Sequence, residues 1–294
     1  MGNLPQFTPD GCQRFSFGGF MERDIIEAAR LIHQSDGILV GAGAGMGVDS
    51  GLPDFRGTEG FWKAYPALGK ARIQFVEIAN PASFAENPPL AWGFYGHRLQ
   101  LYRDTVPHQG FHIIQDWASR MEHGAFAFTS NIDGQFQKAG FAPERVSECH
   151  GSIHFMQCSR PCSREIWPAD YLKVDVDEEQ CMWLPDLPAC KECGVLARPN
   201  ILMFGDWGWI SDRTDLQMER LNRWHNRVKN MVAVELGAGV AVPTVRRMSE
   251  SLKAPLIRIN PTDPQMDRGK KNAIGLPLRG LEALEKIDAV LKTL

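Results

Sequence analysis

The sequence lacks the features that direct a chain into or across a membrane. Its start, MGNLPQFTPDGCQRFSFGGF, contains no basic segment followed by an apolar core, and no later apolar run approaches the length needed to cross a bilayer. It also lacks an excess of charge of one sign, because the net charge is −3 and acidic and basic residues are interspersed. We therefore expect a cytoplasmic location, and neither nucleic acid nor a membrane as a partner.

The 294 residues, of which 44% are hydrophobic, are enough for one large or two unequal domains with a substantial core. Apolar segments that suit buried strands recur along the chain, with helical patterns between them. These segments lie at 37–40, 125–128, 145–149, 200–203, 231–236 and 256–259. The alternation predicts an α/β fold with a doubly wound parallel sheet.

The loop that follows the first predicted strand is rich in glycine. Gly41, Gly43, Gly45 and Gly47 occupy alternate positions in GAGAGMGVDSGLPDFR, residues 41–56. Glycine leaves no Cβ in the way of a ligand's phosphates, so this composition indicates a nucleotide site. A tight strand-to-helix turn without a ligand is the alternative, since it needs the same residues. The dehydrogenase fingerprint G-x-G-x-x-G is absent from the loop, which argues against simple hydride transfer.

Five of the seven cysteines fall in one segment, which begins with Cys158 and Cys162 and ends with Cys190 and Cys193. In a cytoplasmic enzyme this clustering indicates metal ligation before disulfides. Two pairs of thiolates on tight turns can bind one Zn²⁺ tetrahedrally, so these four residues are the predicted ligands. Cys181, between the two pairs, is an alternative ligand, and reduced cysteines without a metal are the other possibility.

The glycine loop and several later segments together resemble the sirtuin family. Residues 43–56 match its signature GAGxSxxxGIPDFR in length, in both GAG glycines and in the closing PDFR, although Gly47 stands where the signature has serine. The blocks TSNID at 129–133, His-Gly at 150–151 and RPNILMFGD at 198–206 resemble the family's TQNID motif, catalytic histidine and RPxVVxFGE segment. The resemblance covers nearly the whole chain, in order.

This resemblance implies NAD-dependent protein-lysine deacylation, with NAD as co-substrate and with nicotinamide, free lysine and O-acyl-ADP-ribose as products. It implies that His150 takes a proton from a ribose hydroxyl, a role that suits an imidazole at neutral pH. Asn131 and Asp133 would hold the nicotinamide ribose and support the nicotinamide pocket; the alternative for Asp133 is a cap of the helix that follows. The implied NAD contacts are Gly43, Ala44, Gly45, Asp54, Phe55, Arg56, Asn131, Asp133, Gly237, Ala238 and Asn260.

Tyr95 and Arg98 lie three residues apart on a predicted helix and share one of its faces. They are ordinary residues of a packed helix, or they correspond to the Y-x-x-R element of sirtuins that remove succinyl, malonyl or glutaryl groups. In those enzymes a guanidinium and a phenol bind a carboxylate. The resemblance therefore implies acyl-lysine proteins or peptides as substrates and an acyl pocket that accepts acids. The implied peptide contacts are Leu202, Phe204, Gly205 and Asp206.

The resemblance also implies how the chain is divided. Residues 1–56, 106–154 and 198–294 would form a Rossmann-like NAD-binding domain. Two insertions, 57–105 and 155–197, would form a smaller helical and zinc-binding domain, in which the zinc is structural.

Departures from the family pattern leave two other functions open. Gly47, Ser130, Ala238 and Gly239 replace residues with longer polar side chains, which keeps mono-ADP-ribosyl transfer or NAD hydrolysis as alternatives. A third hypothesis is a non-catalytic NAD sensor. The presence of both His150 and Asn131 counts against it.

Overall fold

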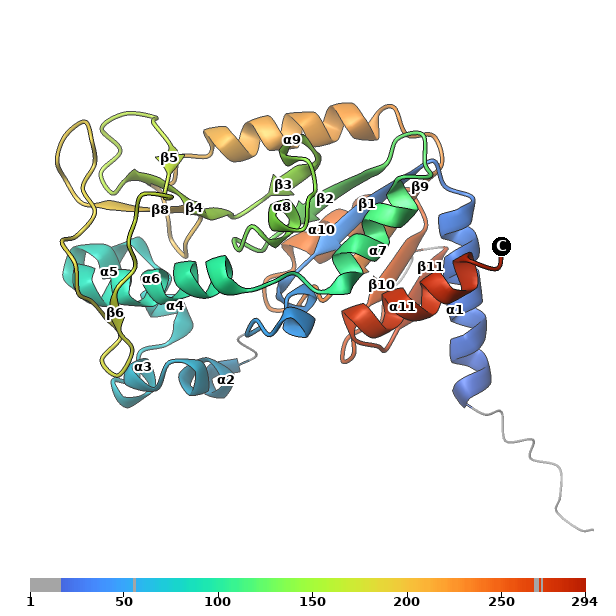
Figure 1. Ribbon diagram of the computed structural model, residues 1–294, viewed down its shortest axis with the longest axis horizontal. Helices are drawn as coiled ribbons and strands as arrows, with labels where there is room; N and C mark the ends of the chain where they lie inside the picture. Colours follow the sequence, from blue (N-terminus) through green and yellow to red (C-terminus); the bar gives the residue numbers. More distant parts are fainter. Residues whose placement is uncertain (1–16, 55–56, 267–269, 271) are drawn as a thin grey trace, which may run out of the picture.

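The structure is a computed structural model that describes residues 17–54, 57–266, 270 and 272–294 (Figure 1). Within these residues a sheet of six parallel strands, in the order β11-β10-β9-β1-β2-β3, forms the larger part of the molecule. This is the strand order of a doubly wound sheet, and it confirms the predicted fold class. The strands are β1 (Gly37–Ala42), β2 (Ala125–Thr129), β3 (Val146–Glu148), β9 (Met231–Leu236), β10 (Leu256–Ile259) and β11 (Ala273–Leu276).

Helices cover both faces of this sheet, so its central strands are apolar on both sides (Figure 1). On β1, Ile38 and Val40 belong to the core under one set of helices, and Leu39 belongs to the core with Trp224 on the other face. No helix in the described ranges is both long and apolar enough to span a bilayer. The helices are α1 (Phe17–His33), α7 (Gln109–Ala118) and α11 (Gly280–Leu291) on one face, and α9 (Asp212–His225) and α10 (Thr244–Ser251) on the other.

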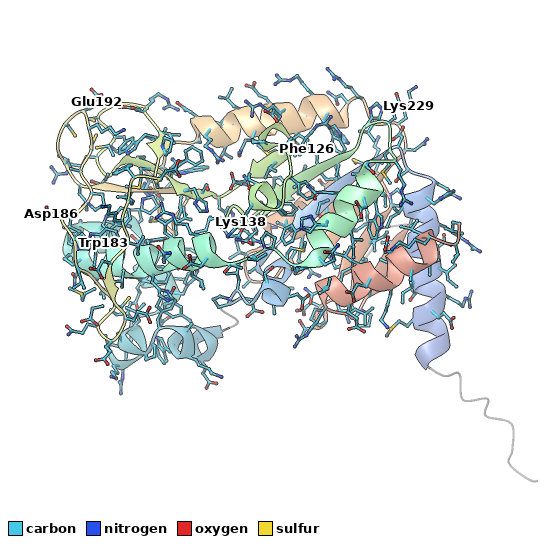
Figure 2. All side chains as sticks on the ribbon, viewed as in Figure 1. Phe126, Lys138, Trp183, Asp186, Glu192 and Lys229 are labelled. Carbon is cyan, nitrogen blue, oxygen red and sulfur yellow. The ribbon has the colours of Figure 1, made fainter. Side chains whose placement is uncertain are left out.

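A second hydrophobic core lies beside the large sheet. It is built on helix α6, two small antiparallel sheets and many aromatic side chains. Figure 2 shows Phe126 within the large sheet and Trp183 toward the opposite end of the molecule, where its ring lies 5.4 Å from that of Trp92. The helices are α2 (Gly57–Ala64), α3 (Pro66–Lys70), α4 (Phe75–Ile78), α5 (Pro81–Glu86) and α6 (Pro88–Asp104). The strands are β4 (Gly151–Cys158), β5 (Trp167–Pro168), β6 (Val176–Asp177), β7 (Met182–Trp183) and β8 (Ala197–Ile201).

The strand predicted at 200–203 is the one that joins a different sheet. It begins earlier, as β8, and pairs antiparallel with β4, so that Gly151 lies opposite Ile201. The edge of the parallel sheet is instead completed by β11, which the apolar pattern did not reveal. A buried apolar run predicts a strand but not its partner, and β11 is a short strand interrupted by Gly275. The short helix α8 (Gln135–Lys138) and the 3₁₀ turns 44–46, 48–50 and 143–145 complete the described elements.

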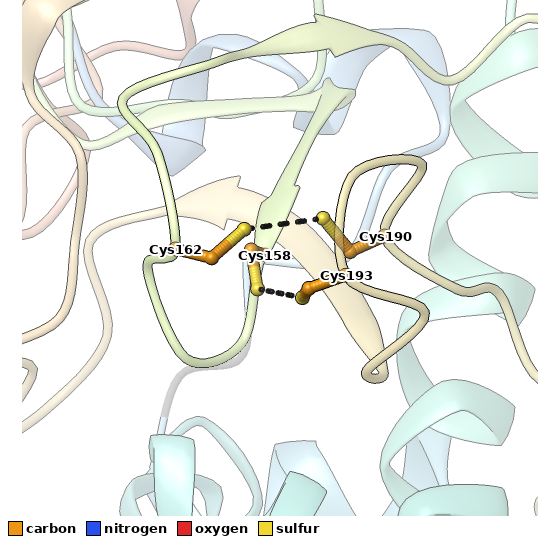
Figure 3. Close-up of side chains that lie close together, drawn as sticks. All are labelled: Cys158, Cys162, Cys190 and Cys193. Carbon is orange, nitrogen blue, oxygen red and sulfur yellow. Dashed lines mark hydrogen bonds between the residues drawn. The ribbon is translucent and has the colours of Figure 1, made fainter.

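The four predicted cysteine ligands lie together at one end of the second core (Figure 3). Their sulfur atoms are all within 4.8 Å of one another, with 3.7 Å between Cys158 and Cys193 and 3.7 Å between Cys162 and Cys190. A tetrahedron with Zn–S bonds of about 2.3 Å has edges of about 3.8 Å, so the cluster fits this ion. Among the described cysteines, Cys181 is outside the group and is buried in the second core.

We predict that the purified protein carries about one zinc per chain and that Cys193→Ser loses most of it. A tetrahedral site that loses a thiolate binds zinc much more weakly, and the turns that it holds together then lose their cross-link. Metal content by mass spectrometry, together with the thermal unfolding midpoint, measures both effects.

Cys181→Ser is the matched control, because it removes a buried sulfur from the same core without touching the cluster. Full zinc occupancy in Cys193→Ser, or zinc loss in Cys181→Ser, would contradict the assigned ligands.

Candidate active site

A cleft of about 690 Å³ opens beside the carboxyl ends of the central strands, where the large sheet meets the second core. Ligands of doubly wound sheets bind at this edge, at the point where the strand order reverses, which here lies between β1 and β9. The cleft brings together residues that the sequence assigns to catalysis, to the cofactor and to the substrate. They are Gly43, Ala44, Asp54, Tyr95, Arg98, Asn131, Asp133, His150, Leu202 and Phe204.

Other predicted residues lie outside the lining of this cleft, as far as the structure describes the chain. Phe55 and Arg56 fall outside the described residues, so their predicted contacts stay predictions. The remaining ones lie outside the lining, and all but the exposed Gly205 pack or hydrogen-bond against neighbouring main chain. They are Gly45, Gly205, Asp206, Gly237, Ala238 and Asn260.

The glycines of the first loop are required by a contact between two loops. A Cβ on Gly43 would lie 2.7 Å from the Ala238 Cα, and one on Gly45 would lie 2.6 Å from the Gly237 Cα. The Gly43 and Gly45 N–H groups donate to the carbonyls of Leu236 and Gly237, each at 3.0 Å. The loop after β9 therefore requires glycine at both positions, and the predicted contacts of these glycines with phosphate stay predictions.

Gly47, the position where the family signature has serine, is covered by Leu52. A Cβ there would lie 3.1 Å from Leu52 Cδ1, and the Leu52 N–H donates to the Gly47 carbonyl at 3.1 Å. Leu52 belongs to the second core, so the missing hydroxyl is replaced by an apolar anchor of the loop.

Asn131 fixes the loop after β2 against the loop after β1. Its Nδ2 donates to the Gly43 carbonyl at 3.0 Å, and its N–H donates to Thr129 Oγ1 at 3.0 Å. Thr129 in turn donates to the Ala42 carbonyl at 2.9 Å. The carboxamide therefore enters the cleft at a position set by two neighbouring strands.

Asp133 is both a turn-forming residue and part of the cleft wall. Its Oδ1 accepts the Gln135 N–H at 3.0 Å, which forms an Asx turn one residue before Gly134, the N-cap of α8. Burial raises the pKa of this carboxyl to about 6, and nearby Glu148 adds to the effect, while Arg98 opposes it. Its charge is therefore sensitive to small changes of pH near neutrality.

His150 lies on the two-residue link between β3 and β4. Its Nε2 is 3.4 Å from Thr244 Oγ1, and a hydrogen bond to the Ser130 main chain also holds the ring. Burial lowers the pKa of the imidazole, so the neutral form that can accept a proton predominates at neutral pH. The sequence did not single out Thr244, because a hydroxyl residue at the start of a helix is common for capping alone.

Helix α6 delivers Tyr95 and Arg98 to the cleft. Asn87 caps its first turn by accepting the Leu90 N–H, and proline occupies the first helical position. Arg98 is 7% exposed, and its Nε and Nη2 donate to Tyr102 Oη at 3.0 and 2.6 Å. Tyr102 was absent from the sequence-based site, although it is one helical turn beyond Arg98 and lines the cleft.

The segment after β8 forms one rim of the cleft. Leu202 and Phe204 are 38% and 39% exposed, and their N–H groups donate to the carbonyls of His150 and Ala79. They offer an apolar surface beside polar main chain. Gly205 follows with φ +66°, a left-handed conformation that suits glycine.

Asp206, predicted as a peptide contact, has a different place. Its carboxylate accepts from Arg198 Nη2 at 2.8 Å and from the Gly208 N–H at 3.1 Å, and both charged side chains are almost fully buried. A buried ion pair of this kind fixes the turn, and losing one partner would leave the other charge uncompensated. The acid therefore shapes the rim without facing the cleft.

Gly237, Ala238 and Asn260 build the loop that meets the first glycine loop. Gly237 has φ +58°, and a Cβ on it would lie 2.4 Å from the main chain of Gly45. Asn260 is 2% exposed and donates to the Ala238 carbonyl at 3.0 Å, as Arg246 does at 3.1 Å. These residues hold the wall of the cleft from behind, and their direct contact with NAD stays a prediction.

Comparisons with known proteins find related sequences and a shared fold. The NAD-dependent protein deacylase of Pyrococcus furiosus is 31% identical over 182 residues, which cover 61% of this chain and 65% of that protein. The mitochondrial NAD-dependent protein deacylase sirtuin-5 of Canis lupus familiaris is 32% identical over 191 residues, covering 60% and 58%. The chain thus matches 58–65% of the length of these relatives.

A solved Sir2 homologue in complex with NAD superposes with a TM-score of 0.67 at 22% identity, over 91% of this chain and 93% of that chain. This likeness shows that the fold is shared. The profile of the Sir2 family matches residues 43–232, which are more than half of the sequence. The chain belongs to the Sir2 family.

Proposed function

We propose that this protein is an NAD-dependent protein-lysine deacylase that releases nicotinamide and O-acyl-ADP-ribose. The observation that carries the proposal is the convergence of His150, Asn131 and Asp133 on one cleft at the switch point of the sheet. The curated relatives that share the family are themselves called NAD-dependent protein deacylases. Substrates would be acyl-lysine side chains of proteins or peptides.

The cleft suits a dinucleotide in size and in chemistry. Its volume of about 690 Å³ lies within the range of small-molecule sites. Ala44 and Asp54 from the first loop and Asn131 from the second would contact NAD, with Gly237 and Ala238 supporting the far wall. When bound, NAD supplies the ribosyl carbon that accepts the acyl oxygen and the nicotinamide that leaves.

His150 acts as the general base in this proposal. Its neutral imidazole would take a proton from a ribose hydroxyl, while Thr244 and the Ser130 main chain keep the ring in place. Because burial disfavours the imidazolium, the residue is ready to accept a proton without first losing one.

Arg98 and Tyr95 support a finer proposal, that acidic acyl groups are accepted. A guanidinium in the wall of a cleft whose lining is largely apolar is a strong site for a carboxylate. Leu202 and Phe204 would contact the peptide, whose extended backbone can pair with main-chain groups of this rim.

We predict that Arg98→Met lowers kcat/KM for a succinyl-lysine peptide about tenfold or more relative to the acetyl peptide of the same sequence. The variant loses a charge-assisted hydrogen bond to the carboxylate of the succinyl group, whereas the acetyl group has no carboxylate to bind. Nicotinamide release and mass spectrometry of the peptide give both rates.

His150→Tyr is the control for the reaction itself and should abolish both activities. Nicotinamide release that does not depend on peptide would indicate NAD hydrolysis, and labelled ADP-ribose on protein would indicate transfer. An unchanged succinyl-to-acetyl ratio in Arg98→Met would refute the acidic pocket.

The lowered pKa of His150 predicts that kcat/KM falls only at acidic pH. Since the required form is the neutral base, kcat/KM should stay on its plateau at pH 7 and fall only below about pH 6.5, the ordinary value for histidine. Initial rates from pH 5 to 9, with circular dichroism to verify folding, test this. A limb centred above pH 7 would contradict the proposal.

The raised pKa of Asp133 predicts that Asp133→Asn stabilises the fold at alkaline pH. The cost of ionising the buried carboxyl is fully present above the folded pKa of about 6 and absent below the ordinary value of 3.8. Asparagine keeps the oxygen that accepts from Gln135 and never ionises, so the gain approaches about 3 kcal/mol at pH 8. Urea unfolding at pH 8 and pH 4.5 measures it.

The exposed Asp116, changed to asparagine, is the control and should alter stability little at either pH. A gain for Asp133→Asn that is equal at both pH values would show that charge burial is not its source.

A further inference from the structure

Tyr102 holds the guanidinium of Arg98 in the cleft. The two residues are four apart on α6, and both line the cleft. Arg98 Nε and Nη2 converge on Tyr102 Oη at 3.0 and 2.6 Å. The guanidinium carbon also lies 5.2 Å from the Phe94 ring centroid and 5.5 Å from that of Tyr102. These hydrogen bonds and ring contacts orient the guanidinium.

Tyr95, the phenol that the family pattern pairs with this arginine, is fixed by different contacts. Its ring stacks on Phe84 with centroids 5.6 Å apart and meets the edge of Phe94 at 4.9 Å. Its side chain is 2% exposed, within the aromatic part of the second core. Tyr95 is thus positioned by packing, whereas Tyr102 is positioned by hydrogen bonds to the charged group itself.

The hydroxyl of Tyr102 has a proton to donate within the cleft. A phenol oxygen accepts through its lone pairs and carries one hydrogen of its own, so two N–H donors leave that hydrogen available for an acceptor. Burial raises the pKa of this phenol, and it therefore keeps its proton at neutral pH. The acceptor is either a group of the protein, of which Asp133 is the charged one nearby, or a group of the substrate.

We infer that Tyr102 is a second determinant of acyl-group choice, which orients Arg98 and donates its phenolic hydrogen to the carboxylate of an acidic acyl group on lysine. The inference rests on the proposed deacylase function. An acid so bound receives a charge-assisted N–H from Arg98 and an O–H from Tyr102. An acetyl group offers no acceptor at this point and gains neither hydrogen bond, which is how a polar site discriminates between substrates.

An alternative role for Tyr102 is to support the carboxyl of Asp133. Arg98 and Tyr102 both act on the carboxyl of Asp133 electrostatically, and Tyr102 and Asp133 also line a second cavity of about 800 Å³. The Tyr102 carbonyl accepts Gln135 Nε2 at 3.1 Å, next to the cap of α8. If this were the function of the hydroxyl, its loss would affect every acyl substrate alike, because Asp133 lies in the part of the cleft assigned to NAD.

Tyr102→Phe separates these roles, because it keeps the ring that divides the two cavities and removes only the hydroxyl. Wild type, Tyr102→Phe and Arg98→Met are compared on acetyl-, succinyl- and glutaryl-lysine peptides of one sequence at saturating NAD. We expect Tyr102→Phe to lower the succinyl-to-acetyl ratio of kcat/KM about tenfold, mainly through a higher KM for the acidic peptide. The peptide bearing the succinyl methyl ester should show no such loss on mutation.

Tyr171→Phe is the control, since Tyr171 carries a phenol that accepts from Trp167 Nε1 at 3.2 Å and lies outside the cleft lining. It should leave the succinyl-to-acetyl ratio at the wild-type value. If Tyr102→Phe lowers kcat/KM equally on all acyl peptides, the hydroxyl supports Asp133. If the succinyl-to-acetyl ratio is unchanged, the hydroxyl has no role in the choice of acyl group. If the wild-type enzyme removes acetyl groups but neither succinyl nor glutaryl groups, this inference is overturned and the proposed function stands. If it is inactive on every acyl peptide, the proposed function is overturned.

Discussion

The contact between the loops after β1 and β9 is the constraint on which the rest of the site depends. Two stretches of main chain meet there so closely that a single methyl group on Gly43 or Gly45 would force them apart. Asn131 binds the carbonyl of Gly43, and Asn260 and Arg246 bind the carbonyl of Ala238. The motifs that follow each strand are therefore arranged around one backbone contact, and the cleft takes its shape from it.

The fold and most of the cleft were predictable because their signals are local. Strand-sized apolar runs mark the sheet, and polar residues directly after them mark its ligand edge. The errors arose where a contact joins distant segments: nothing in residues 197–201 says that they pair with β4, and nothing near Thr244 says that it lies against His150. The glycines were identified correctly as special, but the group that fills the space of their missing side chains is another loop.

The site concentrates groups that are costly to bury. Asp133 has a carboxyl that resists ionisation, His150 an imidazole that resists protonation, and Arg98 a guanidinium among aromatic rings. The scaffold around them uses complete ion pairs instead, as between Arg258 and Glu235 on adjacent strands and between Arg198 and Asp206 under the rim. The charges within the wall are thus paired, so that losing one partner would leave the other uncompensated, whereas the groups with shifted pKa values face the cleft.

His150 also has a mechanical position. Strand β3 ends at Glu148 in the parallel sheet and β4 begins at Gly151 in the antiparallel one, so Cys149 and His150 form the whole link between these two strands. Any rotation of one sheet against the other must be taken up by the torsion angles of these two residues and of Gly151, whose φ is +75°. His150, the base in the proposed mechanism, lies within this link, so a change in the angle between the two sheets would change the direction of its imidazole.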